Sequence, residues 1–248
     1  MEKYMLDRLQ GAIEFFYVKN EKENLNNIYK KVPSGECSGC GSCCNESVGA
    51  YYGEFLNILS GLEKKSLEDR RKIYIKIFEY YLGEYRVKRQ CPFLQDDKRC
   101  SIYDERPLNC RIYGHWKKSE YEQNYNRVLK ENRLKADYLK RERGFSIPGE
   151  IVEYKIEWCK NFKGKIMTKA ERNLLYDEMI SIDSKYFATG NFPLEYADRG
   201  IVEYFVEFFG LKESIDILKF EKISRRKKER IYKVAILKME ELLWKCKN

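Results

Sequence analysis

The chain has 248 residues, of which 43% are hydrophobic, enough to form a buried core and too many for a protein that is disordered throughout. Its 48 Lys and Arg exceed its 39 Asp and Glu, and the formal charge of +9 leaves an anionic partner open without requiring one. Nine cysteines accompany a single histidine, and this imbalance is the most informative feature of the composition.

The first residues, Met1 to Arg8, include acidic side chains and lack the continuous apolar stretch of a secretory signal. No run approaches the roughly 18 uninterrupted apolar residues of a membrane-spanning helix. The best stretch, residues 200–211, is interrupted by Glu203 and Glu207. We therefore expect a soluble, cytoplasmic protein with no membrane association. In a reducing compartment, clustered cysteines bind metals or take part in catalysis more often than they form disulfides.

Apolar residues recur every three or four positions between residues 2 and 20, which predicts an amphipathic helix, and a short second helix is predicted at residues 25–31. Residues 36–45 are rich in Gly, Ser and Cys and have no apolar period, so they predict an irregular loop. A third helix is predicted to begin at Ser66. Its solvent-facing side is expected to carry the basic residues Arg70, Arg71, Lys72 and Lys76.

The apolar period disappears again between residues 89 and 116, where Pro92 and Pro107 favour extended backbone in the residues before them. This second irregular stretch holds the cysteines Cys91, Cys100 and Cys110. The rest of the chain predicts four helices. One covers residues 117–143, one is opened by a capping box of Thr168 and Glu171, and one covers residues 192–209. The last begins after Ser224 and has an apolar stripe of Tyr232, Ala235, Met239, Leu242 and Cys246.

The expected fold class is therefore mainly α, a helical body with two irregular cysteine-rich metal-binding loops. We expect residues 1–116 to form the N-terminal helices and the cysteine-cluster module. Residues 117–248 are expected to form a helical region that packs with this module as one composite domain.

The first loop contains a cysteine run with two-residue intervals and one adjacent pair: Cys37, Cys40, Cys43 and Cys44. A C-x2-C turn can direct two thiolates onto one ion or cluster, and Gly39 and Gly41 permit the backbone angles that such wrapping requires. Incidental packed thiols are a poor alternative, because a polar glycine loop offers cysteine little apolar burial.

The second-loop cysteines Cys91, Cys100 and Cys110 are too widely spaced to chelate as a C-x2-C pair, so they are expected to work with the first set. With Cys159 the total is eight, enough for two four-thiolate sites, and Cys246 is left over. Side chains of adjacent residues in an extended loop diverge, so Cys43 and Cys44 favour two sites or one polynuclear cluster.

The three cysteines at two-residue intervals, Cys37, Cys40 and Cys43, and the proline after Cys91 parallel a ferredoxin-type run. This parallel favours one or two iron–sulfur clusters, of the 4Fe–4S type, over zinc as the alternative.

The pattern Cys37-x2-Cys40-Gly41-x-Cys43-Cys44, followed by Cys91-Pro92-Phe93-Leu94 and by the motif from Cys100 to Tyr113, resembles the YkgJ-type CxxCxxCC cysteine-cluster family. Members are described as zinc- or iron-chelating and are often labelled Fe–S oxidoreductases, so the resemblance implies a metal centre with a redox role. The family often has proline after the final aromatic residue, where this chain has Gly114. A more distant resemblance to flagellin lysine N-methylases implies an alternative iron–sulfur methyltransferase that uses S-adenosylmethionine.

Arg106 and Arg111 lie between or beside the second-loop cysteines, where a cation would lower thiolate pKa values and offset the charge of a thiolate centre. We expect both to support the cofactor without ligating it. His115 could supply a nitrogen ligand, but the eight cysteines favour a structural role for it.

No nucleotide-binding, nucleophile-elbow or calcium-loop motif accompanies these residues, and no catalytic residue can be named. The basic runs at residues 86–89 and 225–228 are more typical of solvated helix faces than of a nucleic-acid site, so nucleic acid is not the expected partner. A redox or protein partner of unidentified kind is expected instead.

Overall fold

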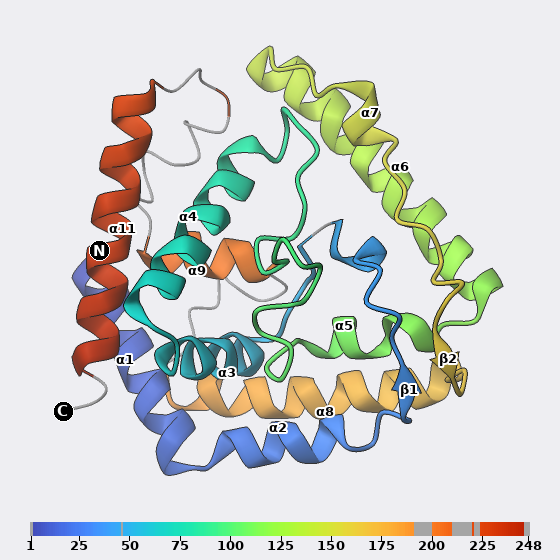
Figure 1. Cartoon of the computed structure of the whole chain (residues 1–248), viewed down its shortest axis with the longest axis horizontal. Coiled ribbons are helices and arrows are strands. Elements are labelled where there is room, and N and C mark those ends of the chain that lie inside the picture. Colours follow the sequence, from blue (N-terminus) through green and yellow to red (C-terminus); the bar gives the residue numbers. More distant parts are fainter. Residues whose placement is uncertain (1, 46, 191–199, 210–219, 221–223, 246–248) are drawn as a thin grey trace.

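The computed structural model describes residues 2–45, 47–190, 200–209, 220 and 224–245. These residues are mainly α-helical, as the sequence predicts, and two short antiparallel strands pair Gly35 with Gly164 and Glu36 with Lys163 (Figure 1). In chain order the elements, with η for 3₁₀ turns, are α1 (Glu2–Val18), α2 (Glu21–Tyr29), β1 (Gly35–Glu36), η1 (Ser42–Asn45), α3 (Tyr52–Glu63), α4 (Leu67–Gly83), α5 (Leu108–Ile112), η2 (Tyr113–His115), α6 (Lys118–Arg143), α7 (Gly149–Val152), β2 (Lys163–Gly164), α8 (Lys169–Ala188), α9 (Ile201–Phe209) and α11 (Arg225–Lys245).

Two predicted helix starts are confirmed in atomic detail. The Ser66 hydroxyl accepts a hydrogen bond from the backbone amide of Asp69 at 3.1 Å, which caps α4. Thr168 and Glu171 form the predicted capping box at the start of α8, with bonds of 3.2 and 2.7 Å. The start predicted at residue 192 and the tail residue Cys246 lie outside the described residues.

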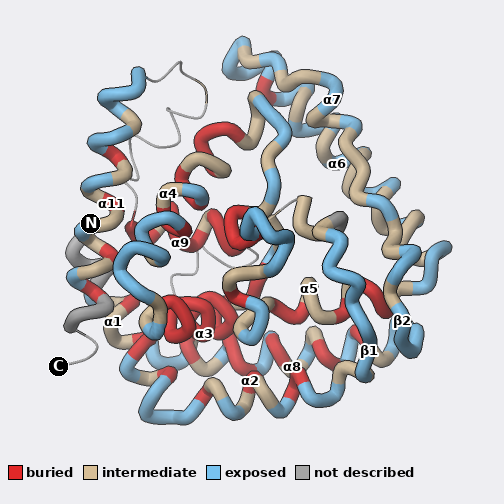
Figure 2. Tube along the Cα trace, viewed as in Figure 1, coloured by how far each residue is buried: buried red, intermediate tan, exposed pale blue. Residues whose placement is uncertain are grey.

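The central helix of the fold, α3, is absent from the sequence prediction. Every residue from Tyr52 to Leu62 is buried, including Glu54 and Asn57 (Figure 2). A helix surrounded by protein on all sides needs no solvent-facing polar side, so the usual division into an apolar and a polar face does not mark it. Gly53, Asn57 and Gly61 are also weak helix formers, so local helical tendency does not mark it either.

The N-terminal end of α3 is capped by a carboxylate from another helix. Asp183 of α8 accepts hydrogen bonds from the backbone amides of Tyr52 and Gly53 at 2.8 and 2.9 Å. These amides belong to the first helical turn, where they have no partner within α3, and the helix dipole favours an anion there. The contact therefore satisfies the buried helix end and joins α8 to α3.

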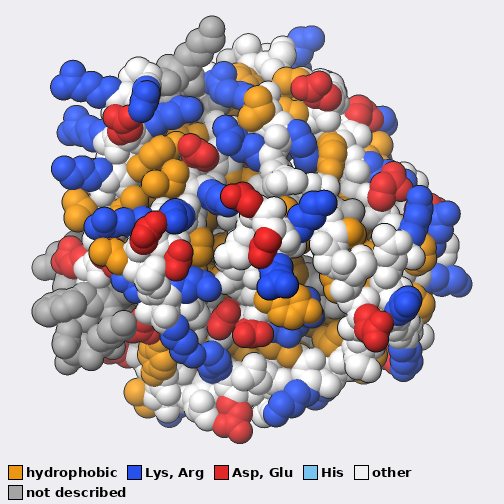
Figure 3. Space-filling model, in the orientation of Figure 1, with side chains coloured by type: hydrophobic (Ala, Val, Ile, Leu, Met, Phe, Trp, Pro, Cys, Tyr) orange, Lys and Arg blue, Asp and Glu red, His pale blue; other side chains and the backbone are white. Residues whose placement is uncertain are grey.

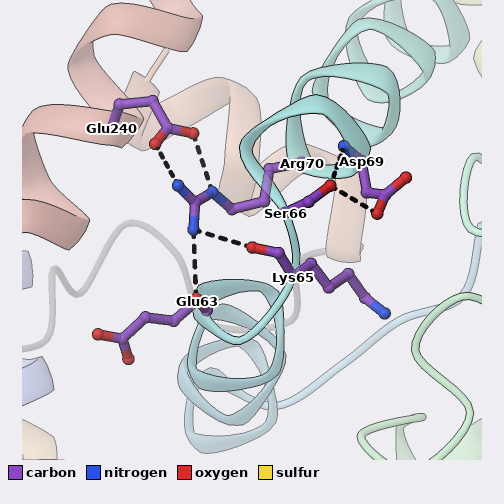
Figure 4. Close-up of polar contacts among 6 residues, drawn as sticks. All are labelled: Glu63, Lys65, Ser66, Asp69, Arg70 and Glu240. Atoms are coloured by element: carbon purple, nitrogen blue, oxygen red, sulfur yellow. Dashed lines mark hydrogen bonds and ion pairs between the residues drawn. The ribbon is translucent and has the colours of Figure 1, made fainter.

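At the opposite end of α3 lies Arg70, whose guanidinium donates to the carbonyl oxygens of Glu63 and Lys65 at 3.2 and 3.3 Å (Figure 4). The same guanidinium makes two bonds to Glu240 of α11, at 3.0 and 2.6 Å. The side chain is only 13% exposed. The expectation that Arg70 faces solvent is therefore wrong, because the carbonyls at the end of α3 and the carboxylate on α11 draw it inward.

Aromatic rings join α3 to α9. The ring of Phe55 stacks on Tyr204 and Phe208, with centroids 5.0 and 5.5 Å apart, and meets Phe205 edge to face at 5.2 Å. One hydrophobic cluster contains residues from both sides of position 116, including Leu9 of α1 and Met239 of α11. The two parts of the chain share this core, and the boundary at residue 116 stays a prediction.

The long helix α6 lies at the edge of the molecule and buries only Leu139 (Figures 1 and 2). Its beginning is attached by Arg172 of α8, a side chain with 2% exposure. Arg172 bonds to Glu120, donates to the Met167 carbonyl at 2.6 Å and stacks on the Trp116 ring at 3.9 Å. Within the described part of the chain, every helix is too short or too polar to cross a lipid bilayer.

Burial raises the pKa of Asp183 from 3.8 to about 6. Between these values the folded protein keeps a proton that the unfolded chain has released, so stability should fall as pH rises through this window. We expect the free energy of unfolding of the native protein, measured in urea, to fall relative to that of Asp183→Asn as the pH rises from 4.5 to 6.5. The exposed Asp177→Asn on the same helix is the matched control, and a pH-independent difference would contradict the assignment.

Candidate metal centre

The two cysteine loops lie side by side, although 46 residues (45–90) separate Cys44 from Cys91 in the sequence. The backbone amide of Cys91 donates to the carbonyl oxygen of Cys44 at 2.8 Å, which joins the second loop directly to the first. Positive φ angles at Gly39 (66°) and Gly41 (72°) let the first loop turn back toward the second. The thiols of both loops thereby face a common space.

That space is a cavity of about 650 Å³. Its walls include all the described cysteines, which are free thiols: Cys37, Cys40, Cys43, Cys44, Cys91, Cys100, Cys110 and Cys159. Cys37 and Cys40 are exposed, and the others are half-buried. The fold thus brings together every cysteine that the sequence singled out as a ligand candidate.

Four of these thiols form what we call the inner set: Cys43, Cys91, Cys100 and Cys110. Burial raises the pKa of Cys91 to about 12 and that of Cys110 well above its usual value. Within the inner set, the neighbouring thiols add to the increase for Cys91, Cys100 and Cys110. Four close thiolates would repel one another, so this arrangement requires a bound cation before all four can ionise.

The adjacent pair Cys43 and Cys44 departs from expectation. Their backbone forms the 3₁₀ turn η1, and their sulfur atoms are 3.9 Å apart. Two thiolates on one tetrahedral zinc would be separated by about 3.8 Å. The expectation that these side chains diverge is therefore wrong, because it assumed an extended loop.

The thiols nevertheless surround a space and do not converge on a point. Among the described residues, no three Cys, His, Asp or Glu side chains are arranged to hold one metal ion. The cavity is many times larger than the roughly 30 Å³ that a water molecule occupies. The donor set therefore suits thiophilic metals, and the space exceeds that of a single ion.

A buried carboxylate, Glu54, positions the helix that carries Cys110. One of its oxygens accepts from the Tyr29 hydroxyl at 3.0 Å and from the Leu108 amide at 2.5 Å, at the start of α5. The other accepts from the Tyr51 amide at 3.0 Å. Burial raises the pKa of Glu54 to about 7, although all three hydrogen bonds oppose this increase. The sequence analysis missed Glu54, and its signal was an acid within an apolar run.

Arg111 and Arg106 both line the cavity, but they differ in what they contact. Arg111 donates to the Arg106 carbonyl at 2.8 Å and stacks over the Tyr29 ring at 3.9 Å, so it holds the loop in shape. Arg106 lies 4.0 Å from the Tyr103 ring centroid, and its charge opposes the increase that burial produces in the pKa of Cys100. Its buried Nε has no hydrogen-bond partner within the described structure. Arg106 is thus the cation better placed to serve a bound group.

His115 is buried, and its Nδ1 lies 2.6 Å from the Lys165 carbonyl oxygen. Its ring meets Phe162 edge to face at 4.6 Å. Phe162 also lies against Gly114, where an added Cβ would approach the Phe162 ring to 2.3 Å. These contacts give His115 a packing role and explain why glycine occupies position 114.

Residues 36–128 match the model of the CxxCxxCC family, whose description is "putative zinc- or iron-chelating domain". The predicted resemblance to this cysteine-cluster family is confirmed for that segment. An uncharacterized protein of Methanocaldococcus jannaschii is 32% identical over 97 residues, which cover 38% of this chain and 52% of the relative. The chain thus spans about half the length of that relative. No solved structure matches the chain.

Replacing Glu54 with Gln should release α5. Whichever way the amide is oriented, its NH₂ group faces a backbone donor, because all three partners of Glu54 donate. A lost buried hydrogen bond of this kind costs about 1–3 kcal/mol. We expect a lower Tm and a lower metal content per chain, measured by thermal circular dichroism and elemental analysis.

The matched control is Glu178→Gln, which makes the same change at a surface pair with Lys31. An exposed pair contributes at most about 1 kcal/mol, so this variant should keep its metal. Equal metal content in the two variants would contradict the positioning role of Glu54.

Proposed function

We propose that the inner set binds an iron–sulfur cluster of the 4Fe–4S type and that the protein has a redox role. The coarser function, chelation of zinc or iron, is what the family description gives for residues 36–128. The observation that carries the finer proposal is the arrangement of the inner thiols around a cavity of about 650 Å³, with no three described ligands converging on one point. A cluster interposes several iron and sulfide atoms between its thiolates, whereas a single ion requires them to converge.

The charge and hydrogen bonding of the cavity wall support the same proposal. A cluster with four thiolates carries net negative charge, and its potential depends on nearby cations and on hydrogen bonds to sulfur. Arg106 supplies a cation near Cys100 and a buried, unpartnered Nε. When bound, the cluster would supply reversible one-electron transfer, while this chain's own residues hold the thiols, neutralise charge and exclude water.

Zinc is the second candidate, because one observation favours it. The 3.9 Å separation of the Cys43 and Cys44 sulfur atoms is close to that of two thiolates on one zinc ion. A zinc centre closed by four thiolates would stabilise the loops and would have no redox role.

As partner we propose a redox or protein partner of unidentified kind, and not a nucleic acid. The basic run at residues 86–89 is engaged within the fold, with Arg86 over the Phe145 ring at 5.2 Å and Lys88 over the Tyr154 ring at 3.2 Å. The second run opens α11 and is exposed at residues 225–227. On the face shown in Figure 3, acidic side chains are scattered among the basic ones. Neither arrangement forms the basic groove with stacked aromatics that single-stranded nucleic acid prefers.

Anaerobic purification followed by iron, sulfide and zinc analysis tests the proposal. We expect brown protein with iron and acid-labile sulfide near four each per inner cluster, as 4Fe–4S stoichiometry requires. Colourless protein with zinc and no sulfide would overturn the iron–sulfur proposal in favour of zinc.

Cys91→Ser should remove the inner centre, because serine does not replace a thiolate for a thiophilic metal. Cys246→Ser, at a cysteine outside the motif, is the matched control and should keep its metal. Unchanged metal content in Cys91→Ser would show that the inner set is wrongly composed.

A further inference from the structure

One cysteine on the cavity wall comes from outside the family domain. Cys159 lies beyond residues 36–128, yet its thiol faces the cavity with those of the motif. It belongs to residues 156–164, which we call the closing segment. The conformation of this segment therefore decides whether the cavity has an eighth thiol.

Hydrogen bonds hold the closing segment against the family domain. The Tyr121 hydroxyl donates to the Ile156 carbonyl at 2.6 Å, and the Tyr113 hydroxyl bonds to the Glu157 carbonyl. The Trp158 indole donates to the Trp116 carbonyl at 2.8 Å. At its end, β2 pairs with β1, immediately before the first cysteine loop. The segment is thus fixed on both sides of Cys159.

Phe162 anchors the same segment by shape. Three glycines surround its ring so closely that an added Cβ would lie 2.1 Å from it at Gly35, 2.3 Å at Gly114 and 2.6 Å at Gly164. Two of these glycines belong to the strands, and the third follows the last motif aromatic. The three glycines thus leave room for the Phe162 ring, and Cys159 is three residues away from it.

Removing the inner set from the eight thiols leaves Cys37, Cys40, Cys44 and Cys159. Burial raises the pKa of Cys159, and the thiols of Cys40 and Cys43 add to this increase, which places the Cys159 thiol beside the cysteines of the first loop. Two of the remaining four, Cys37 and Cys40, are exposed, in contrast to the inner set. Four thiolates are the usual complement of a tetrahedral zinc or a cubane cluster.

We propose that Cys37, Cys40, Cys44 and Cys159 form a second, outer metal centre, assembled between the family domain and the closing segment. The proposal rests on the proposed function in taking the cavity as a thiolate metal site. It places Cys43 and Cys44 in different centres, so it is incompatible with a single zinc ion that binds both. The outer centre lies at the solvent-exposed side of the cavity and the inner centre behind it. Phe162 is a positioning residue: its ring fixes the closing segment among the three glycines, and its backbone amide, like that of Asn161, donates a hydrogen bond to the Cys159 thiol.

Metal stoichiometry of Cys159→Ser tests the outer centre. We expect the native protein to carry two centres per chain and the variant to lose about half of its metal while it keeps the absorption and labile sulfide of the inner centre. Cys246→Ser should match the native protein. A Cys159→Ser variant with native stoichiometry, or a native protein with one centre, would overturn the proposal.

Phe162→Ala keeps all the cysteines and removes the anchor. It should lose the same share of metal, and a chelator should extract the remaining outer metal faster than from the native protein. Phe145→Ala, at a ring that packs on Phe220 away from the cavity, is the control. Native stoichiometry and extraction rate in Phe162→Ala would refute the anchoring role. Metal identity is measured separately from the number of centres. Two zinc ions per chain would reject the iron–sulfur proposal and leave the outer centre standing, whereas one zinc ion per chain would overturn both.

Discussion

The cysteine site depends on one buried carboxylate. Glu54 is fully enclosed and accepts hydrogen bonds from Tyr29 of α2, from the backbone at Tyr51 before α3 and from Leu108 at the start of α5. Each donor would be costly to bury without this acceptor, and the carboxylate would be costly to bury without the donors. The three segments therefore cannot move independently. The loop that carries Cys110 takes its position from the helical core and not from its own residues.

The sequence was sufficient wherever structure follows from a local pattern. Amphipathic stripes predicted α1, α4, α8 and α11, and the caps at Ser66 and Thr168 have the predicted hydrogen bonds. The pattern failed for α3, which is buried on all sides and has no solvent-facing side to identify. It also failed for Arg70, because nothing near this residue in sequence shows that Glu240 will be opposite. Both failures concern contacts with distant parts of the chain.

The same contrast between local patterns and contacts with distant parts of the chain holds for the candidate site. Two-residue spacing identified the cysteines of the first loop, since that spacing is local chemistry. The directions of the Cys43 and Cys44 side chains depend on a 3₁₀ turn, which the spacing of the cysteines in the sequence does not predict. The enclosure of Phe162 by Gly35, Gly114 and Gly164 joins three regions of the chain, and each glycine alone resembles an ordinary loop residue. The sequence thus predicted which thiols are available to bind a metal, and tertiary packing decides which of these thiols lie together.

The pairing of β1 with β2 has a consequence for the order of events during synthesis. Ribosomes make the chain from its N-terminus, so all cysteines of residues 36–128 emerge before Cys159 and before Lys163 and Gly164 can pair with Glu36 and Gly35. Until then the cavity lacks one wall and one thiol. A nascent chain that has not reached residue 156 therefore contains seven of the eight cavity thiols, and the eighth is added only with the closing segment.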